Sequence, residues 1–325
     1  GSLTFDISMD TNLENKNNND WFKDGSIVGK YNNNLNEKFN LKIESAFQTK
    51  KTYIRNSSTI NKIKYKNSLS STINLSGYNL KKIDDQFKFI ISSYQVVKNN
   101  EDNKTTPTAL PYISYSSGID YYKETKYENS YQFYNIIRDT ATNDLAQRQK
   151  KLSHLITTNN IKYNFNSKID FKTELHNQYF ETENKLINSV NESSKYYRPF
   201  PISGIFIETP MKYSTKNLFF TPKVSLIVSA GSSNTNKISN EESTNNLYSI
   251  NNLVKLNRYA GTDKLDNSKR LNFGFNITKD KIQINFVENY EFTKNSNYHY
   301  SMGNHDYLGD AMMDISYNGI SDKDD

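Results

Sequence analysis

Apolar and polar residues alternate along much of the chain, with an apolar residue at every second position. Such runs occupy residues 3–7, 39–47, 161–165, 169–171, 271–277 and 282–292. Because successive side chains of a strand point to opposite faces, each run predicts a strand with one apolar and one polar face. No comparably clear helical period appears, although residues 144–152 fit one or two helical turns.

The connections between these runs differ in length. Short joints are expected at residues 84–85, 166–167 and 279–280, and long polar loops at residues 98–108, 181–195 and 231–246. Outer-membrane barrels combine short turns on one side with longer loops on the other, and cross with alternating segments of about ten residues. Strands of soluble domains are most often about 5–6 residues long.

The expected fold is therefore all-β, an antiparallel meander of long strands forming part of a large transmembrane β-barrel. In such a barrel the apolar faces contact lipid and the polar faces line a wet lumen. A soluble sandwich, propeller or solenoid would use the same strands with the apolar faces inside. Alternation alone does not distinguish the two arrangements.

Composition changes this picture little. Hydrophobic residues make up 35% of the chain and aromatic residues 13%, with 24 Tyr and 18 Phe. Few hydrophobic but many aromatic residues fit strands with two unlike faces better than disorder.

The net charge of +6 is spread along the chain, so nucleic acid is not an expected partner. The absence of cysteine excludes disulfides and thiolate metal sites. No apolar run is long enough for a transmembrane helix, and no signal peptide is recognised.

Candidate chemistry is sparse. None of the four histidines, His154, His176, His299 and His305, stands in a zinc-protease motif, and no hydrolase elbow or phosphate loop is present. We therefore expect no catalytic residues, no metal site, no cofactor and no enzymatic activity. Pro107 and Pro111 are interpreted as prolines at a strand start, where a missing N–H group is tolerated.

One region has a more specific pattern, in three stretches at residues 238–243, 252–264 and 270–275. It resembles the signature region of the barrel domain of the LptD family, the lipopolysaccharide-assembly proteins. The matching positions are Asn240, Glu241, Ser243, Asn257, Arg258, Gly261, Asp263, Arg270, Asn272 and Gly274. The departures are Ser239 for proline, Glu242 for aspartate, Tyr259 for phenylalanine and Lys264 for arginine. Weaker similarities lie at residues 106–115 and 298–304.

The resemblance implies a function. A member of this family would sit in the outer membrane of a Gram-negative bacterium and insert lipopolysaccharide into the outer leaflet without catalysing a reaction. Its implied partners are lipopolysaccharide, an LptE-like lipoprotein plug and a periplasmic LptA-like bridge. The ten matching residues would be structural, with residues 257–263 as a polar turn in which Arg258 pairs with Asp263. Residues 1–325 would be one barrel-domain fragment, truncated at both ends, forming an open or curled half-barrel.

Two alternatives stay open. The chain could belong to another outer-membrane barrel, such as a porin or a receptor. It could also be a soluble surface β-sheet protein that binds carbohydrate or a partner, with Phe and Ile inside and Lys and Asn outside.

Overall fold

The predicted all-β, antiparallel class is confirmed. The computed structural model describes residues 1–11, 22–51, 53–56, 66–98, 103–213, 217–231, 237–244, 249–293, 304–305, 307–309 and 311–317. The helices within these ranges are two single turns, α1 (Tyr53–Asn56) and α2 (Ile250–Leu253). The remaining regular structure consists of β-strands, which pair antiparallel with near neighbours in the sequence as a meander.

Two compact units make up the chain. Unit 1 comprises Gly1–Gly118, Ser130–His154 and Tyr179–Tyr196, and unit 2 comprises Ile119–Asn129, Leu155–Gln178 and Tyr197–Asp325. Four long strands contribute residues to both units: β8 (Thr125–Ile137), β9 (Arg148–Asn164), β10 (Ser167–Ile187) and β11 (Val190–Glu208). With 21 residues, β10 is about twice the length that crosses a bilayer.

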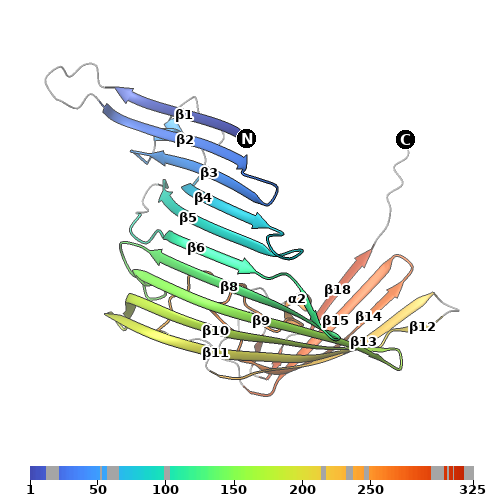
Figure 1. Cartoon of the computed structure of the whole chain (residues 1–325). Coiled ribbons are helices and arrows are strands. Elements are labelled where there is room, and N and C mark those ends of the chain that lie inside the picture. Colours follow the sequence, from blue (N-terminus) through green and yellow to red (C-terminus); the bar gives the residue numbers. More distant parts are fainter. Residues whose placement is uncertain are drawn as a thin grey trace. The chain divides into compact units, whose positions relative to one another are not determined.

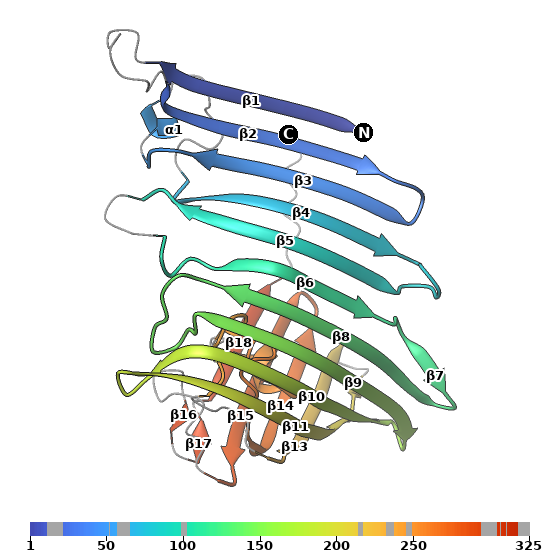
Figure 2. The same cartoon turned by 60° about the vertical axis from the view of Figure 1, so that its left-hand side comes forward.

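Unit 1 is built on a run of strands in chain order (Figures 1 and 2). These are β1 (Ser2–Thr11), β2 (Phe22–Asn34), β3 (Phe39–Gln48), β4 (Ser68–Tyr78), β5 (Gln86–Val96) and β6 (Thr108–Ser116). Each pairs antiparallel with the next, and β6 pairs with β8. A small apolar cluster of Ile54, Leu69 and Val97 lies where α1 packs on these strands.

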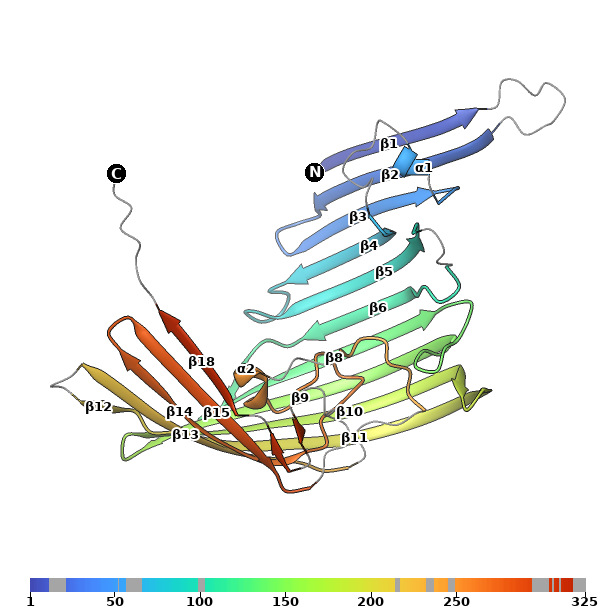
Figure 3. The same cartoon turned by 180° about the vertical axis from the view of Figure 1, so that it is seen from behind.

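Unit 2 contains the remaining elements. They are β7 (Asp120–Tyr122), β12 (Met211–Tyr213), β13 (Leu218–Ser229), β14 (Lys269–Lys279), β15 (Ile282–Glu291), β16 (Asn304–His305), β17 (Leu308–Gly309), β18 (Met312–Tyr317) and α2. Strand β13 pairs with β11 and β14, and β15 pairs with β14 and β18. Figure 3 shows β13, β14, β15 and β18 side by side.

The two faces of a strand have opposite character, as β13 illustrates. Ser225 and Ile227 are 4% and 0% exposed, whereas Val224, Leu226 and Val228 between and beside them are 40–45% exposed. Among the described residues, the buried set contains more polar and charged side chains than hydrophobic ones. The exposed face of such a strand is therefore its apolar face.

Tight hairpins occur at two of the expected joints. Strands β9 and β10 are joined by Phe165 and Asn166, whose φ angles are 46° and 64°, and Asp280 at the β14–β15 joint has φ 51°. Positive φ values at the turn residues match the twist of antiparallel hairpins. The third joint differs, because Asp84 and Asp85 end a longer connection that spans residues 79–85.

The prediction of a long polar loop at residues 181–195 is wrong. These residues end β10 and begin β11, with a tight turn at residues 188–189. Glu181 forms ion pairs with Lys150 and Lys195, at 3.0 and 3.4 Å. Polar side chains continue the strands here because they pair with one another across the sheet, which a hydrophobicity pattern does not register.

The helical interpretation of residues 144–152 is also wrong. Residues 138–147 form turns and irregular backbone, and β9 begins at Arg148. In this strand the buried positions are Gln149, Lys151 and Ser153. The period of two is thus present but carried by polar residues, whose contacts include the Tyr134 ring beneath the Lys151 ammonium at 5.4 Å.

Candidate functional site

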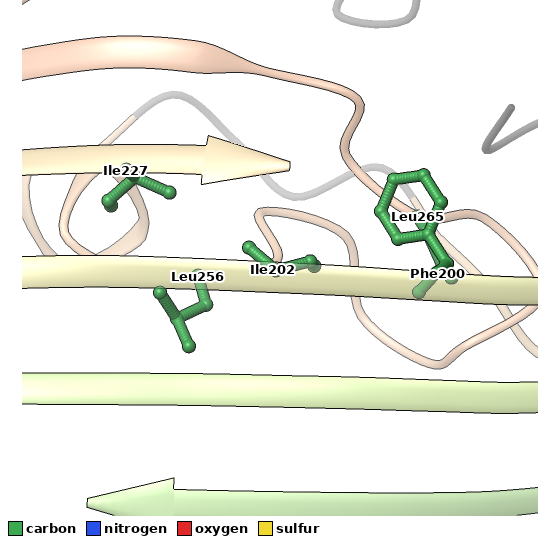
Figure 4. Close-up of a cluster of buried hydrophobic side chains, with 5 residues drawn as sticks. All are labelled: Phe200, Ile202, Ile227, Leu256 and Leu265. Carbon is green, nitrogen blue, oxygen red and sulfur yellow. The ribbon is translucent and has the colours of Figure 1, made fainter. Parts of the chain in front are cut away.

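The connection between β13 and β14 folds back onto the sheet of unit 2 instead of extending away from it. We call its described part from residue 249 to residue 268, with residues 237–244 before it, the covering segment. Leu256 and Leu265 of this segment form a buried apolar cluster with Phe200 and Ile202 of β11 and Ile227 of β13 (Figure 4). This cluster anchors the covering segment to the strands.

Four charged side chains form a fully buried network beneath the covering segment. Arg258 donates to Asp266 at 2.6 Å and to Glu291 of β15 at 2.5 Å, and Arg270 of β14 donates to Asp266 at 2.9 Å. All four side chains are 0% exposed. Burial by itself lowers the pKa of Arg258, but the carboxylates of Asp266 and Glu291 outweigh it and raise that pKa above its ordinary value.

A second buried arginine holds the covering segment from the side of β11. The Arg198 guanidinium donates to the backbone carbonyls of Thr262 at 2.7 Å and Asp263 at 2.8 Å, and to the Gln178 amide oxygen of β10 at 2.9 Å. Gln178 in turn donates to the Thr262 carbonyl at 3.0 Å. Because these carbonyls lie in an irregular loop, side-chain donors replace the strand partners that they lack.

The pairing expected between Arg258 and Asp263 is corrected by the structure. The Asp263 carboxylate accepts hydrogen bonds from the backbone N–H groups of Glu241 and Glu242, at 2.8 and 3.0 Å. It thereby joins the two halves of the covering segment, whereas the ion pairs of Arg258 are with the network described above. The Glu242 carboxylate accepts from the Thr262 N–H at 3.1 Å and closes the same junction.

Three further motif residues organise the covering segment internally. The Asn240 side chain accepts from the Ser243 N–H at 3.1 Å, and the Ser243 hydroxyl accepts from the Lys264 N–H at 2.9 Å. The Asn257 side-chain oxygen accepts from the Asp266 N–H at 3.1 Å, which places Asp266 for its ion pairs. Each contact is local to the segment and satisfies backbone groups outside regular structure.

The motif residues on β14 connect that strand to the covering segment. Arg270 donates to the Leu256 carbonyl at 3.4 Å, in addition to its ion pair. The Asn272 amide donates to the Ser225 hydroxyl of β13 and to the Leu253 carbonyl at the end of α2, both at 2.9 Å. These side chains point to the polar face of the sheet, which the segment covers.

Two motif glycines occupy positions without space for a side chain. Gly261 has φ +76°, and a Cβ there would lie 2.6 Å from the Glu242 carbonyl oxygen. A Cβ on Gly274 would lie 2.0 Å from the Phe286 carbonyl oxygen of the neighbouring strand. All ten motif positions are thus brought together in the covering segment and on β14.

The two prolines take different positions. Pro107 directly precedes β6, as expected for a strand start. Pro111 lies inside β6, where the pairing with β5 and with β8 shifts register on either side of it. A proline is tolerated there because the irregularity removes the need for its N–H group.

Sequence reasoning missed four residues that complete this site: Asp266, Glu291, Arg198 and Gln178. A signal existed for Asp266, which stands four residues before the motif residue Arg270. The others are charged or polar residues on strands, and only folding brings them to the covering segment. Within the described residues no group of three or more metal-binding side chains occurs, and no helix there has the length and hydropathy to cross a membrane.

Comparison with known proteins gives a family. A sequence model described as LptD, LPS transport system D, matches residues 23–289. Among solved structures, the β domain of the Bordetella autotransporter BrkA is similar at 8% identity, with 98% of this chain and 97% of that chain covered and a TM-score of 0.27. A TM-score this low carries no argument about the fold. No curated protein matches the sequence.

Proposed function

The chain belongs to the LptD family of lipopolysaccharide transport proteins, and from this membership we propose that it forms part of the outer-membrane barrel that inserts lipopolysaccharide into the outer leaflet. We propose further that units 1 and 2 belong to one barrel domain of a Gram-negative outer membrane. The function needs no covalent step and no cofactor.

The observation that carries this proposal is the polarity of the strands. Val224, Leu226 and Val228 are exposed on one face of β13, while Ser225 and Ser229 are buried on the other, together with Ile227, which packs against the covering segment. A soluble sheet protein would gain from burying the aliphatic side chains and would lose by exposing them to water. A lipid environment covers these side chains, and the polar residues then face the interior of a barrel.

An aromatic row on unit 2 agrees with a lipid-covered face. Phe220, Phe275 and Phe286 lie on neighbouring strands β13, β14 and β15, with ring centroids 5.8 and 5.3 Å apart. The row crosses the middle of the β14–β15 hairpin, since Phe275 pairs with Phe286 halfway along its ladder. Outer-membrane barrels present an outward apolar band at this height of their strands.

We propose that the ten motif residues act structurally, by holding the covering segment against the polar face of unit 2. Their contacts are with one another, with backbone groups and with the charged network, which supports this role over direct contact with lipopolysaccharide. An LptE-like lipoprotein and a periplasmic LptA-like bridge are proposed as partners on family membership alone.

The transport proposal is tested by depleting the full-length protein in its own bacterium. Lipopolysaccharide is then measured on intact cells with an antibody to its sugar, and in separated inner and outer membranes. We expect surface lipopolysaccharide to fall and inner-membrane lipopolysaccharide to rise, with recovery when the protein is resupplied. Unchanged surface lipopolysaccharide after depletion would contradict the proposal and favour a porin or receptor, which solute uptake would then detect.

The membrane arrangement is tested separately with single cysteines, because the chain has none of its own. The neighbouring positions Leu226 and Ser225 on β13 form a matched pair, with exposed fractions of 40% and 4%. In membranes, a fluorophore at Leu226→Cys should be quenched from the lipid phase, and one at Ser225→Cys should not. Equal water access at both positions would favour the soluble sheet protein.

A further inference from the structure

One charged side chain lies within the exposed apolar face of unit 2. Glu288 of β15 is half-buried, whereas its neighbours Val287 and Asn289 are 5% and 0% exposed. Because neighbouring side chains of a strand point to opposite faces, Glu288 belongs to the apolar face. Between the strand ends of β13, β14, β15 and β18, every other residue of that face is apolar or aromatic.

Aromatic side chains flank Glu288 along and across the strands. Phe286 and Tyr290 are its neighbours on the same face of β15, and Phe273 lies opposite on β14. Phe292 follows on the side of the long loop, with its ring centroid 5.6 Å from that of Tyr290. Glu288 therefore lies in an aromatic part of the face and not at its polar border.

The two lysines of the same face on β14 lie at the ends of that strand. Lys269 is four residues and Lys279 six residues from Phe273, which is about 13 and 20 Å along the strand. Both distances exceed the length of a lysine side chain. None of the ion pairs within the described residues involves Glu288. Within the described part of its own chain, Glu288 thus has no cationic partner.

A carboxylate on a lipid-covered face is unfavourable, because hydrocarbon offers neither water nor a hydrogen-bond donor. Ionisable residues inside a membrane are accordingly rare, pair with another group and mark functional positions. The lipid-covered arrangement of unit 2 rests on the proposed function. In this arrangement Glu288 requires a cation from another molecule.

We propose that the apolar face around Glu288 docks a membrane-spanning segment of a different outer-membrane protein, which presents an arginine or lysine to this carboxylate. The apolar residues of the partner segment pack on the aromatic side chains of β14 and β15. An arginine suits the place best, because its flat guanidinium can bind a carboxylate and stack on an aromatic ring at the same time.

The position of Glu288 favours this partner over two others. A lipid headgroup amine entering from the side of the long loop would have to pass Tyr290 and Phe292 to reach the carboxylate, whereas a segment that spans the membrane already lies at its depth. A second copy of this chain, docked through the same face with two-fold symmetry, would bring two Glu288 carboxylates together and not a carboxylate and a cation.

The test is photo-crosslinking of the full-length protein in its own bacterium. The photo-reactive residue p-benzoylphenylalanine replaces Phe273, which pairs with Glu288. After illumination of intact cells, mass spectrometry identifies the molecules attached to this position. We expect a protein adduct whose crosslinked peptide belongs to a membrane-spanning segment with an arginine or lysine. The matched control has the same replacement at Phe220, on the same face of β13, and should not form this adduct.

Substitutions at Glu288 test the charge. Glu288→Gln keeps the size of the side chain and should lower the yield of the adduct by about tenfold or more, because the partner's cation is then unpaired inside the membrane. Glu288→Asp keeps the charge and should change the yield by less than about threefold. Glu288→Arg should abolish the adduct, and a glutamate in place of the partner's cation should restore it. The amount of each variant in the outer membrane is the control for folding.

Three outcomes overturn the inference: adducts with lipid alone, an adduct with a second copy of this chain, or a protein adduct whose yield Glu288→Gln leaves unchanged. The depletion experiment and the lipid quenching at Leu226→Cys report on the proposed function independently. If both give the expected result and no Glu288-dependent adduct forms, only the docking surface fails. If the adduct forms while depletion leaves surface lipopolysaccharide unchanged, the docking surface stands and the transport proposal fails.

Discussion

Two ion-pair networks of similar layout lie in the two units. In unit 1, Glu44 on β3 accepts from Lys30 on β2 and from Lys42, both at 3.1 Å. In unit 2, Asp266 accepts from Arg258 and Arg270, at 2.6 and 2.9 Å. In each, one carboxylate lies between two cations, and the network of unit 2 also includes Glu291. The side chains of the first network are 26–67% exposed, whereas those of the second are 0% exposed.

The difference shows that burial under the covering segment, more than the arrangement of charges, decides how much these residues contribute to the free energy of unfolding. An exposed ion pair is screened by water and contributes about 0–1 kcal/mol. A buried pair need not stabilise the fold by itself, but removing one partner leaves an unpaired charge in a place without water. The covering segment therefore turns an ordinary polar face into one that tolerates little change.

The largest effect is expected for Asp266→Ala. It leaves Arg258 and Arg270 buried with their shared carboxylate missing, and we expect a loss of about 3–5 kcal/mol in the free energy of unfolding. Urea unfolding of the full-length protein in detergent micelles, followed by circular dichroism, measures this loss. A loss below about 1 kcal/mol would mean that water reaches the network.

A smaller effect is expected for Gly261→Ala, which tests the fit of the covering segment. Its positive φ alone costs an alanine about 1–2 kcal/mol, and the Glu242 carbonyl at 2.6 Å adds a clash. Gly231→Ala is the control for backbone strain without a clash, because Gly231 also has a positive φ, +104°, while a Cβ there would lie 3.5 Å from its nearest neighbours, Phe200 and Pro199. If the two variants lose equal stability in the same unfolding assay, the segment does not pack as closely as described.

Glu44→Ala, the counterpart of Asp266→Ala in unit 1, should matter far less. We expect a change below about 1 kcal/mol, and one that shrinks as salt is added, because water and ions screen the exposed lysines. The same unfolding assay at low and high salt measures it. A loss as large as that of Asp266→Ala would show that this part of unit 1 is also covered.

The smallest effect is expected for the local stability of the turn at residues 79–85, which should depend on pH. Burial would raise the pKa of Asp85, but hydrogen bonds from the backbone N–H groups of Lys81, Leu80 and Lys82 outweigh it and lower that pKa. The turn is therefore fully stabilised above the ordinary aspartate pKa of about 3.9 and loses this contribution as pH falls through the lowered value.

Hydrogen exchange at the Leu80 and Lys81 amides measures this loss of protection. Asp85→Asn should abolish the pH dependence, because an amide does not titrate in this range. A wild-type exchange rate, corrected for intrinsic pH effects, that stays constant down through the acid range would contradict the prediction.

Much of the fold was predictable because strands and tight turns produce patterns among neighbouring residues of the sequence. Alternation located β3, β14 and β15, and turn composition located the hairpins after β9 and β14. These patterns did not predict the strands at residues 148–152 and 181–195, where polar residues are buried or paired across the sheet. Hydrophobicity reports burial only when the buried residues are apolar, so a sheet with a polar buried face escapes it there.

The sequence by itself determined the all-β class, the spacing of the motif residues and the family that they indicate. Only the tertiary structure decided what those residues contact. Arg258 meets Glu291 across 33 positions of the chain, and Arg198 meets the Thr262 carbonyl across 64. Such contacts follow from strand register and from the folding back of the covering segment, both of which depend on pairings between residues far apart in the chain, whereas alternation and turn formation depend on immediate neighbours.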